Sequence, residues 1–250
     1  MSQAGTSGFF TLGVTPDQYH LPHPRLGLPV ILLVRRVLLR AFEILRDNRF
    51  SLATEKEDRI TEQLFNVIEN KLRPTGEIKG FNSRSFDRMA RQAQMTNYSG
   101  EKLAKTPDLS FKLRHDEIEP RPVISAQDAL FIECKPVDAA HAAGGKYCDD
   151  GLCRFVNGDY AWAMQEALML AYARDRRTIT DHLLPAMREP ARMKRLQTER
   201  LPAPISAVEA GPTRFAEIVH MSRHRRNFPW RDGKGQATPI GVFHLWCLCG

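Results

Sequence analysis

The sequence predicts one α/β domain in which helices flank a mixed β-sheet, with a helical addition at the N-terminal end and extra strands at the C-terminal end. A chain of 250 residues, 42% of them hydrophobic and 26% charged, is long enough to bury a core. Apolar residues recur at helical spacing early in the chain, and short strand-like runs follow. Residues 1–25, rich in Gly, Pro, Ser and Thr, predict a flexible arm, and residues 26–250 form the single domain.

Two helices are expected at the start of the domain. The first runs from about residue 28 to 46, and the second covers residues 54–74 and ends at Pro74 and Gly76. The second helix has one apolar stripe, made of Ile60, Leu64, Val67, Ile68 and Leu72. These helices form the helical addition.

Strands are expected next. The clearest are "DLSFKLR" at 108–114 and "ALFIECKPV" at 129–137, and the prolines and acids between them indicate a loop over 115–128. A long helix is then expected over 157–175, with Asn157 as its N-cap. Its buried side would consist of Trp162, Met164, Leu168, Met169 and Tyr172.

The last third of the chain combines a basic helix with two strands. A helix over 179–201 would be kinked or broken at its two prolines, and strand-like segments follow at 214–224 and 239–249. One basic cluster on this helix is either a phosphate surface or a solvated helix face, and it comprises Arg188, Arg192, Lys194 and Arg195.

Composition indicates the kind of partner and compartment. The formal charge of +7 and the pI near 9.3 favour polyanions, with nucleic-acid phosphates first and acidic membranes second. Three arginines interrupt the longest apolar block too early for a membrane span of about 20 residues. Five cysteines, an odd number, and no recognisable signal peptide predict a reduced, cytoplasmic protein without a membrane partner.

Charged residues inside two of the expected strands indicate a metal site. Side chains alternate along a strand, so Glu133 and Lys135 project together while Cys134 points the other way. If the two strands pair, Asp108 reaches the same place, and two carboxylates suit Mg²⁺ or Mn²⁺. Such an ion would activate water, and Lys135 would assist the nucleophile and stabilise charge on a phosphate.

The pair "PD" at 107–108 and the triplet "ECK" at 133–135 resemble the motif of the PD-(D/E)xK nuclease superfamily. The resemblance covers roughly residues 55–175 and implies a restriction-endonuclease-like fold. By that resemblance Asp108 and Glu133 are metal ligands and Lys135 is catalytic. An acidic residue on the preceding helix would complete the site, either Glu62, which is preferred, or Glu57.

The same resemblance implies the activity, a divalent-metal-dependent DNA endonuclease in bacterial defence or DNA processing. The alternative is a nucleic-acid-binding subunit that does not cleave. A structural alternative has Asp108 capping a turn and Glu133 paired with Lys135 on an edge strand. No P-loop motif is present, so a partner protein would supply any ATPase or recognition function, and cleavage of both strands would favour a homodimer or a partner nuclease.

Several further residues are candidates for nucleic-acid contacts. Arg154, which lies between Tyr147 and Tyr160, would hold a phosphate near the metal or pair with a neighbouring aspartate. The basic and aromatic stretch 220–231 has the composition of a nucleic-acid surface. Its candidate contacts are Arg223, Arg225 and Arg226, next to Phe228 and Trp230.

Overall fold

The protein is described by a computed structural model that covers residues 21–102, 105–112, 126–205, 218–230 and 235–249. One seven-stranded sheet has the strand order β1-β2-β3-β4-β7-β6-β5. The strands are β1 (Ala90–Arg91), β2 (Leu109–Lys112), β3 (Ala129–Val137), β4 (Glu166–Ala173), β5 (Thr198–Pro204), β6 (His220–His224) and β7 (Ile240–Leu248). The helices are α1 (Leu28–Asp47), α2 (Glu57–Val67), η2 (Ile68–Leu72), α3 (Arg73–Thr75), η3 (Ala143–Leu152), α4 (Cys153–Val156), η4 (Ile179–Leu183), α5 (Leu184–Arg188) and α6 (Pro190–Arg195).

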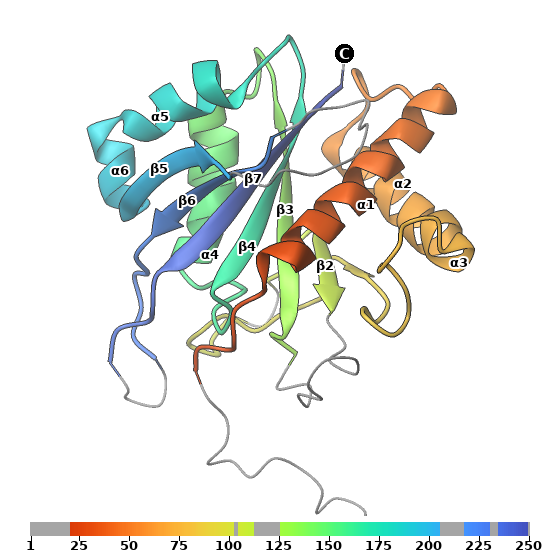
Figure 1. Cartoon of the computed structure of the whole chain (residues 1–250). Coiled ribbons are helices and arrows are strands. Elements are labelled where there is room, and N and C mark those ends of the chain that lie inside the picture. The colour runs from red at the N-terminus through yellow and green to blue at the C-terminus, as the bar shows by residue number, and fades with distance from the viewer. Residues whose placement is uncertain (1–20, 103–104, 113–125, 206–217, 231–234, 250) are drawn as a thin grey trace, which may run out of the picture.

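The sheet is mixed, and helices lie on both sides of it (Figure 1). β3, β4 and β7 are parallel in its centre, while β2 and β6 add antiparallel partners on either side. Every residue of β3 and β4 is buried, as is typical of parallel strands covered on both faces. The predicted α/β architecture is therefore confirmed.

The two N-terminal helices are confirmed as well. Residues 57–75 form one continuous helical segment, and the predicted stripe is buried except for the half-buried Val67. Pro74 lies inside the last turn, and Gly76 ends the helix in the left-handed conformation, at φ 62°. Gly76 therefore acts as the helix terminator that the sequence predicted.

The long helix predicted over 157–175 is wrong, because residues 157–165 form turns and irregular structure and residues 166–173 form β4. Its apolar residues are all buried between β3 and β7 and cannot show a helical stripe, so periodicity does not separate a helix from a strand here. Positive φ angles at Gly158 and Ala161 also turn the chain before the strand begins. Of the side chains assigned to its buried face, only Trp162 is partly exposed.

A helix that the sequence did not predict, η3, covers the face of β3 and β4 that carries Glu133 and Lys135. The sequence did not predict η3 because it contains several glycines, and glycine is unfavourable in an isolated helix. Gly151 has a packing reason, because a Cβ there would lie 2.8 Å from Met169 Cε and 3.3 Å from Lys135 Cγ. A side chain at this position would require Met169 Cε and the Lys135 side chain to move, so the glycine permits the close contact of η3 with β3 and β4.

The predictions for the arm 1–25, the loop 115–128 and the helix 179–201 have different outcomes. Residues 1–20 and most of the loop 115–128 lie outside the described residues. His23, at the described end of the predicted arm, is buried, and its amide donates a 2.8 Å hydrogen bond to Ala163. The helix predicted over 179–201 continues through Pro185 as η4 and α5, breaks at Glu189 before Pro190, where α6 begins, and gives way to β5 in its last residues.

A buried polar chain joins η3 to the C-terminal strands. Tyr147 lies 2.9 Å from His244 Nδ1, and Ser222 Oγ lies 2.7 Å from the Nε2 atoms of both His244 and His224. His224 Nδ1 is 2.8 Å from the Leu196 carbonyl. Burial lowers the pKa of His224 to about 4, so the ring is neutral at pH 7, and both of its nitrogens contact partners in this network.

We expect Gly158→Ala to destabilise the protein by about 2 kcal/mol or more. Gly158 has φ 70°, and a Cβ would meet the Phe228 ring at 2.6 Å. Chemical unfolding measures the loss, and Gly235→Ala is the control, since Gly235 has φ 87° but no atom within 4 Å of its Cβ position. Equal losses at both positions would show that φ alone sets the cost.

Among the described residues, no helix is both long and apolar enough to cross a membrane. α1, with 20 residues, has the length of a membrane-spanning helix, but several arginines interrupt its apolar sequence. One of them, Arg35, is buried within the fold. α1 therefore packs as an ordinary amphipathic helix.

Candidate active site

The candidate site forms where β3 continues beyond the end of β2. β2 pairs with β3 only as far as Ile132, and β3 continues to Val137. Asp108 immediately precedes β2, and its Oδ2 accepts a 2.6 Å hydrogen bond from the Cys134 amide. The carboxylate thus takes the place of a strand partner, which explains an acid at the start of an apolar strand.

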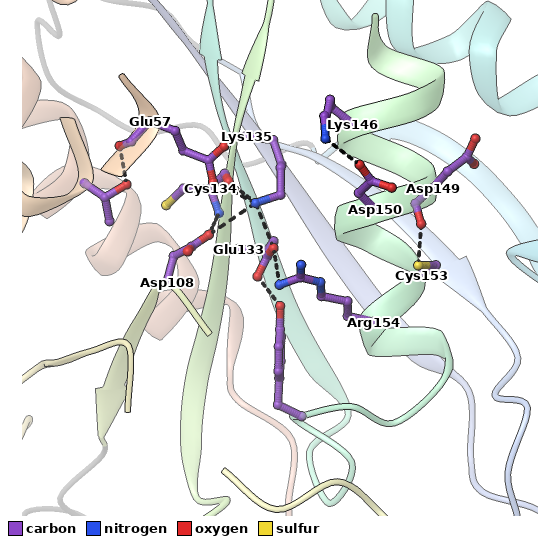
Figure 2. A network of polar contacts seen from close by, with 12 residues as sticks. Glu57, Asp108, Glu133, Cys134, Lys135, Lys146, Asp149, Asp150, Cys153 and Arg154 are labelled. Atoms are coloured by element: carbon purple, nitrogen blue, oxygen red, sulfur yellow. Dashed lines mark hydrogen bonds and ion pairs between the residues drawn. The ribbon is translucent and has the colours of Figure 1, made fainter. Parts of the chain in front are cut away.

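Lys135 lies at the centre of three carboxylates (Figure 2). Its Nζ is 2.7 Å from Glu57 Oε1 and 2.9 Å from Glu133 Oε1. Asp108 Oδ2 lies 3.7 Å from the same nitrogen, and the Cys134 carbonyl accepts a 2.7 Å hydrogen bond from it. The structure therefore brings Asp108, Glu133 and Lys135 together, with Glu133 and Lys135 on one predicted strand and Asp108 one residue before the start of the other.

Glu133 is the most deeply buried of the three acids, with none of its side chain exposed. Tyr160 donates a hydrogen bond to its Oε2, and Arg154 Nη1 lies 2.9 Å from its Oε1. Burial, followed by the charge of Asp108, raises the pKa of Glu133 to about 7. The cations Lys135 and Arg154 offset this rise only in part.

The pKa values of Asp108, Glu57 and Lys135 are also shifted, by burial and by the neighbouring charges. Burial raises the pKa of Asp108 and of Glu57. Burial alone would lower the pKa of Lys135, but the nearby charges of Glu133, Asp108 and Glu57 outweigh it and raise that pKa. Lys135 is therefore an ammonium, and a cluster of carboxylates with raised pKa values is typical of a functional site.

Glu57, and not the preferred Glu62, adjoins the cluster. Glu57 is the first residue of α2, so its side chain projects from the helix end toward Lys135. Glu62 is more than one turn further along, where it pairs with Arg59 at 2.5 Å and is 39% exposed. A shift of five residues on a helix changes the direction of the side chain, so the preference for Glu62 does not agree with this geometry.

We expect Glu57→Gln to reduce metal-dependent cleavage about 100-fold, because it removes a carboxylate that contacts Lys135. Glu62→Gln is the matched control and should change the rate less than about twofold, since its carboxylate contacts Arg59 at the surface. Single-turnover cleavage rates provide the comparison. A larger loss of cleavage rate in Glu62→Gln than in Glu57→Gln would instead identify Glu62 as the acidic residue that completes the site.

Arg154 lies at the predicted site, but its partner is neither of the neighbouring aspartates. Asp149 pairs instead with Arg192 at 3.0 Å, and Asp150 pairs with Lys146 at 3.0 Å. Arg154 reaches Glu133 from α4, and 36% of its side chain stays exposed. It is thus accessible to a substrate phosphate as well as to the carboxylate.

The other predicted nucleic-acid contacts divide into exposed and buried residues. Arg225 is exposed, and Arg223 is partly exposed and pairs with Glu199. Arg226 is buried and donates to the carbonyls of residues 161, 162 and 164, so its assignment to nucleic acid is wrong. Phe228 and Trp230 are buried too and cannot stack on bases.

A pocket of about 690 Å³ opens beside the carboxylate cluster. Charged side chains from α2, β3 and η3–α4 line it, among them Glu57, Lys135, Lys146 and Arg154. Its size lies within the range of small-ligand sites, about 300–1,000 Å³. The pocket therefore gives a polar substrate access to Lys135.

The donor chemistry of the cluster suits a divalent cation. Oε1 of Glu133 is buried and accepts no hydrogen bond in good geometry, although two cations lie 2.9 Å from it. Within the described part of the chain, the cations that pair with the three carboxylates are Lys135 and Arg154, and hard oxygen donors are the ligands that Mg²⁺ prefers. Among the described residues, however, no three acidic, His or Cys side chains already form a metal-binding group.

Two contacts of the site were missed by sequence reasoning. Tyr160 was noted only as a neighbour of Arg154, and its bond to Glu133 depends on the turn at Ala161 that precedes β4. The bond from the Cys134 amide to Asp108 depends on where β2 stops. Neither feature has a local sequence signal, since both follow from strand pairing.

Comparison with known proteins gives no match for this chain among protein-family models, curated proteins or solved structures.

Proposed function

We propose that the chain is a divalent-metal-dependent nuclease of the PD-(D/E)xK type, with DNA as substrate and internal phosphodiester bonds as the sites of hydrolysis. The observation that supports this is the convergence of Glu57, Asp108, Glu133 and Lys135 at one end of β3. A mixed sheet flanked by helices is compatible with a restriction-endonuclease-like fold. Bacterial defence or DNA processing is the proposed setting.

The residues divide the chemistry among them. Asp108 and Glu133 would hold Mg²⁺ or Mn²⁺, with Glu57 as the additional carboxylate. The ion, when bound, supplies Lewis acidity toward a phosphoryl oxygen. The Lys135 ammonium orients the attacking water and stabilises the negative charge that grows on the phosphate, and its raised pKa favours this role over that of a base. Tyr160 holds Glu133 in place through its hydrogen bond.

The second candidate is a subunit that binds nucleic acid without cleaving it. One observation favours it, because Lys135 and Arg154 already pair with Glu133 and together neutralise part of the carboxylate cluster. A site whose acids are permanently paired in this way would serve fold stability. The two candidates differ in their dependence on divalent ions.

The deciding experiment is cleavage of a circular plasmid with Mg²⁺ or Mn²⁺ against EDTA. We expect nicking that requires the ion, disappears in Asp108→Asn, and persists in Asp47→Asn, which changes an exposed aspartate at the end of α1. A labelled single strand and an RNA serve as further substrates. Intact binding without cleavage by the wild type under all these conditions would favour the binding subunit.

A further inference from the structure

The net charge of the chain is concentrated in two segments. Residues 184–204 and 220–226 contain eight Arg or Lys and two Glu, which leaves +6 of the formal +7. The remaining residues are therefore nearly balanced, with a formal charge of +1. A charge imbalance of this kind on one part of a fold creates a local positive field that attracts polyanions.

Strand pairing brings the two segments together. β5 pairs with β6, with Arg200 opposite Arg223, and the Arg225 amide donates a 2.9 Å hydrogen bond to the Gln197 carbonyl. α5, which carries Arg188, and α6 lie next to β5, and α6 leads directly into it, so both helices border the same sheet edge (Figure 1). We call this surface the basic edge, and its residues are Arg188, Lys194, Arg195, Arg200, Arg223 and Arg225.

Most cations of the basic edge lack a neutralising partner. Within the part of the chain that the structure describes, no carboxylate pairs with Arg188, Lys194, Arg200 or Arg225, and all four are exposed. Like charges opposite one another on neighbouring strands, as at Arg200 and Arg223, are destabilising on their own. An anion bound at this edge would relieve that repulsion.

The basic edge adjoins the candidate active site. Asp149 lines the pocket beside Lys135, and it pairs with two α6 residues, Arg192 at 3.0 Å and Arg195 at 2.5 Å. Arg195 remains 53% exposed despite this contact. A polyanion on the edge would therefore extend toward the pocket.

We propose that the basic edge binds the phosphate backbone of a nucleic-acid duplex and holds it next to the active-site pocket. A duplex fits better than a single strand, because the aromatic residues that the structure describes in this region, Phe228 and Trp230, are buried and offer no platform for unstacked bases. Phosphate contacts of this kind carry no sequence information, so binding is independent of base sequence. The inference rests on the proposed function for the identity of the substrate.

Binding of a labelled DNA duplex by the full chain in EDTA tests the inference separately from cleavage. The test variant replaces the four unpaired cations, Arg188, Lys194, Arg200 and Arg225, with Gln. The control variant replaces four exposed cations near α1 and η2, Arg36, Lys71, Lys79 and Arg88, with Gln. Both remove the same charge, and thermal unfolding verifies that both stay folded.

We expect the test variant to bind the duplex at least about tenfold more weakly, with a salt slope shallower by about 3 to 4, as for four lost phosphate contacts. The control variant should keep the wild-type slope, and a single strand of equal length should bind more weakly than the duplex. Equal losses in both variants, or tighter binding of the single strand or of phosphatidylserine vesicles, would overturn the inference. If the wild type binds the duplex through the basic edge but never cleaves it, the proposed nuclease activity is refuted and the binding role of the basic edge stands.

Discussion

Lys135→Met is expected to lower the cleavage rate about 1,000-fold, because among the described residues Lys135 is the ammonium that lies between the three carboxylates and can stabilise charge on the phosphate. Methionine keeps the length of the side chain and its apolar contacts. The rate is measured under single-turnover conditions with saturating Mg²⁺, so that weaker substrate binding does not contribute. Lys71→Met, at an exposed position of η2, is the control and should leave the rate unchanged.

The same substitution should also destabilise the fold by about 3 kcal/mol near pH 8, because it leaves buried carboxylates without their main counterion. The loss should be smaller near pH 5, where Glu133, with its pKa of about 7, is protonated in the folded state. Urea unfolding in EDTA at the two pH values measures both. A variant that remains folded and cleaves within about tenfold of the wild type would remove Lys135 from the catalytic residues.

The central strands were predictable from the sequence because their chemistry is local. "ALFIECKPV" is mostly apolar apart from Glu133 and Lys135, and alternation alone places these two charged residues on one face. Pairing with "DLSFKL" then brings Asp108 to the same place. The core of the site thus depends on two short segments and one strand contact.

Features that depend on tertiary context were not predictable in this way. β4 is buried on both faces, so its residues 166–173 show no period that separates strand from helix. η3 contains glycines that are unfavourable in an isolated helix but necessary at Gly151 for contact with β3 and β4. The choice between Glu57 and Glu62 required the orientation of α2, which local spacing does not determine.

Glu133→Gln is expected to abolish cleavage and yet stabilise the folded protein by about 3 kcal/mol near pH 8. The folded-state pKa of Glu133 is about 7 against 4.5 for a free glutamate, so the folded protein binds a proton that the unfolded chain has already released. The wild type therefore loses stability as the pH rises from about 4.5 to 7, and the full cost is present above pH 7. Glutamine carries no charge and avoids this cost.

The contacts of Glu133 should survive the substitution. The amide oxygen of glutamine can face Lys135 and Arg154, while its NH₂ group donates to the Tyr160 hydroxyl, which now donates to the carboxylate. Two carboxylates, Glu57 and Asp108, then face the two cations, so the charges of the cluster balance.

Urea unfolding in EDTA at pH 5 and pH 8 provides the measurement, with the exposed Glu62→Gln as control. The stability gain of Glu133→Gln should be large at pH 8 and small at pH 5, because pH 5 lies only slightly above the unfolded-state pKa of 4.5 and little of the cost has built up there. A loss of stability at pH 8 would mean that the ion pairs with Lys135 and Arg154 outweigh the burial of the charge. A gain accompanied by loss of cleavage would mean that the wild type keeps a destabilising charge because the reaction requires it.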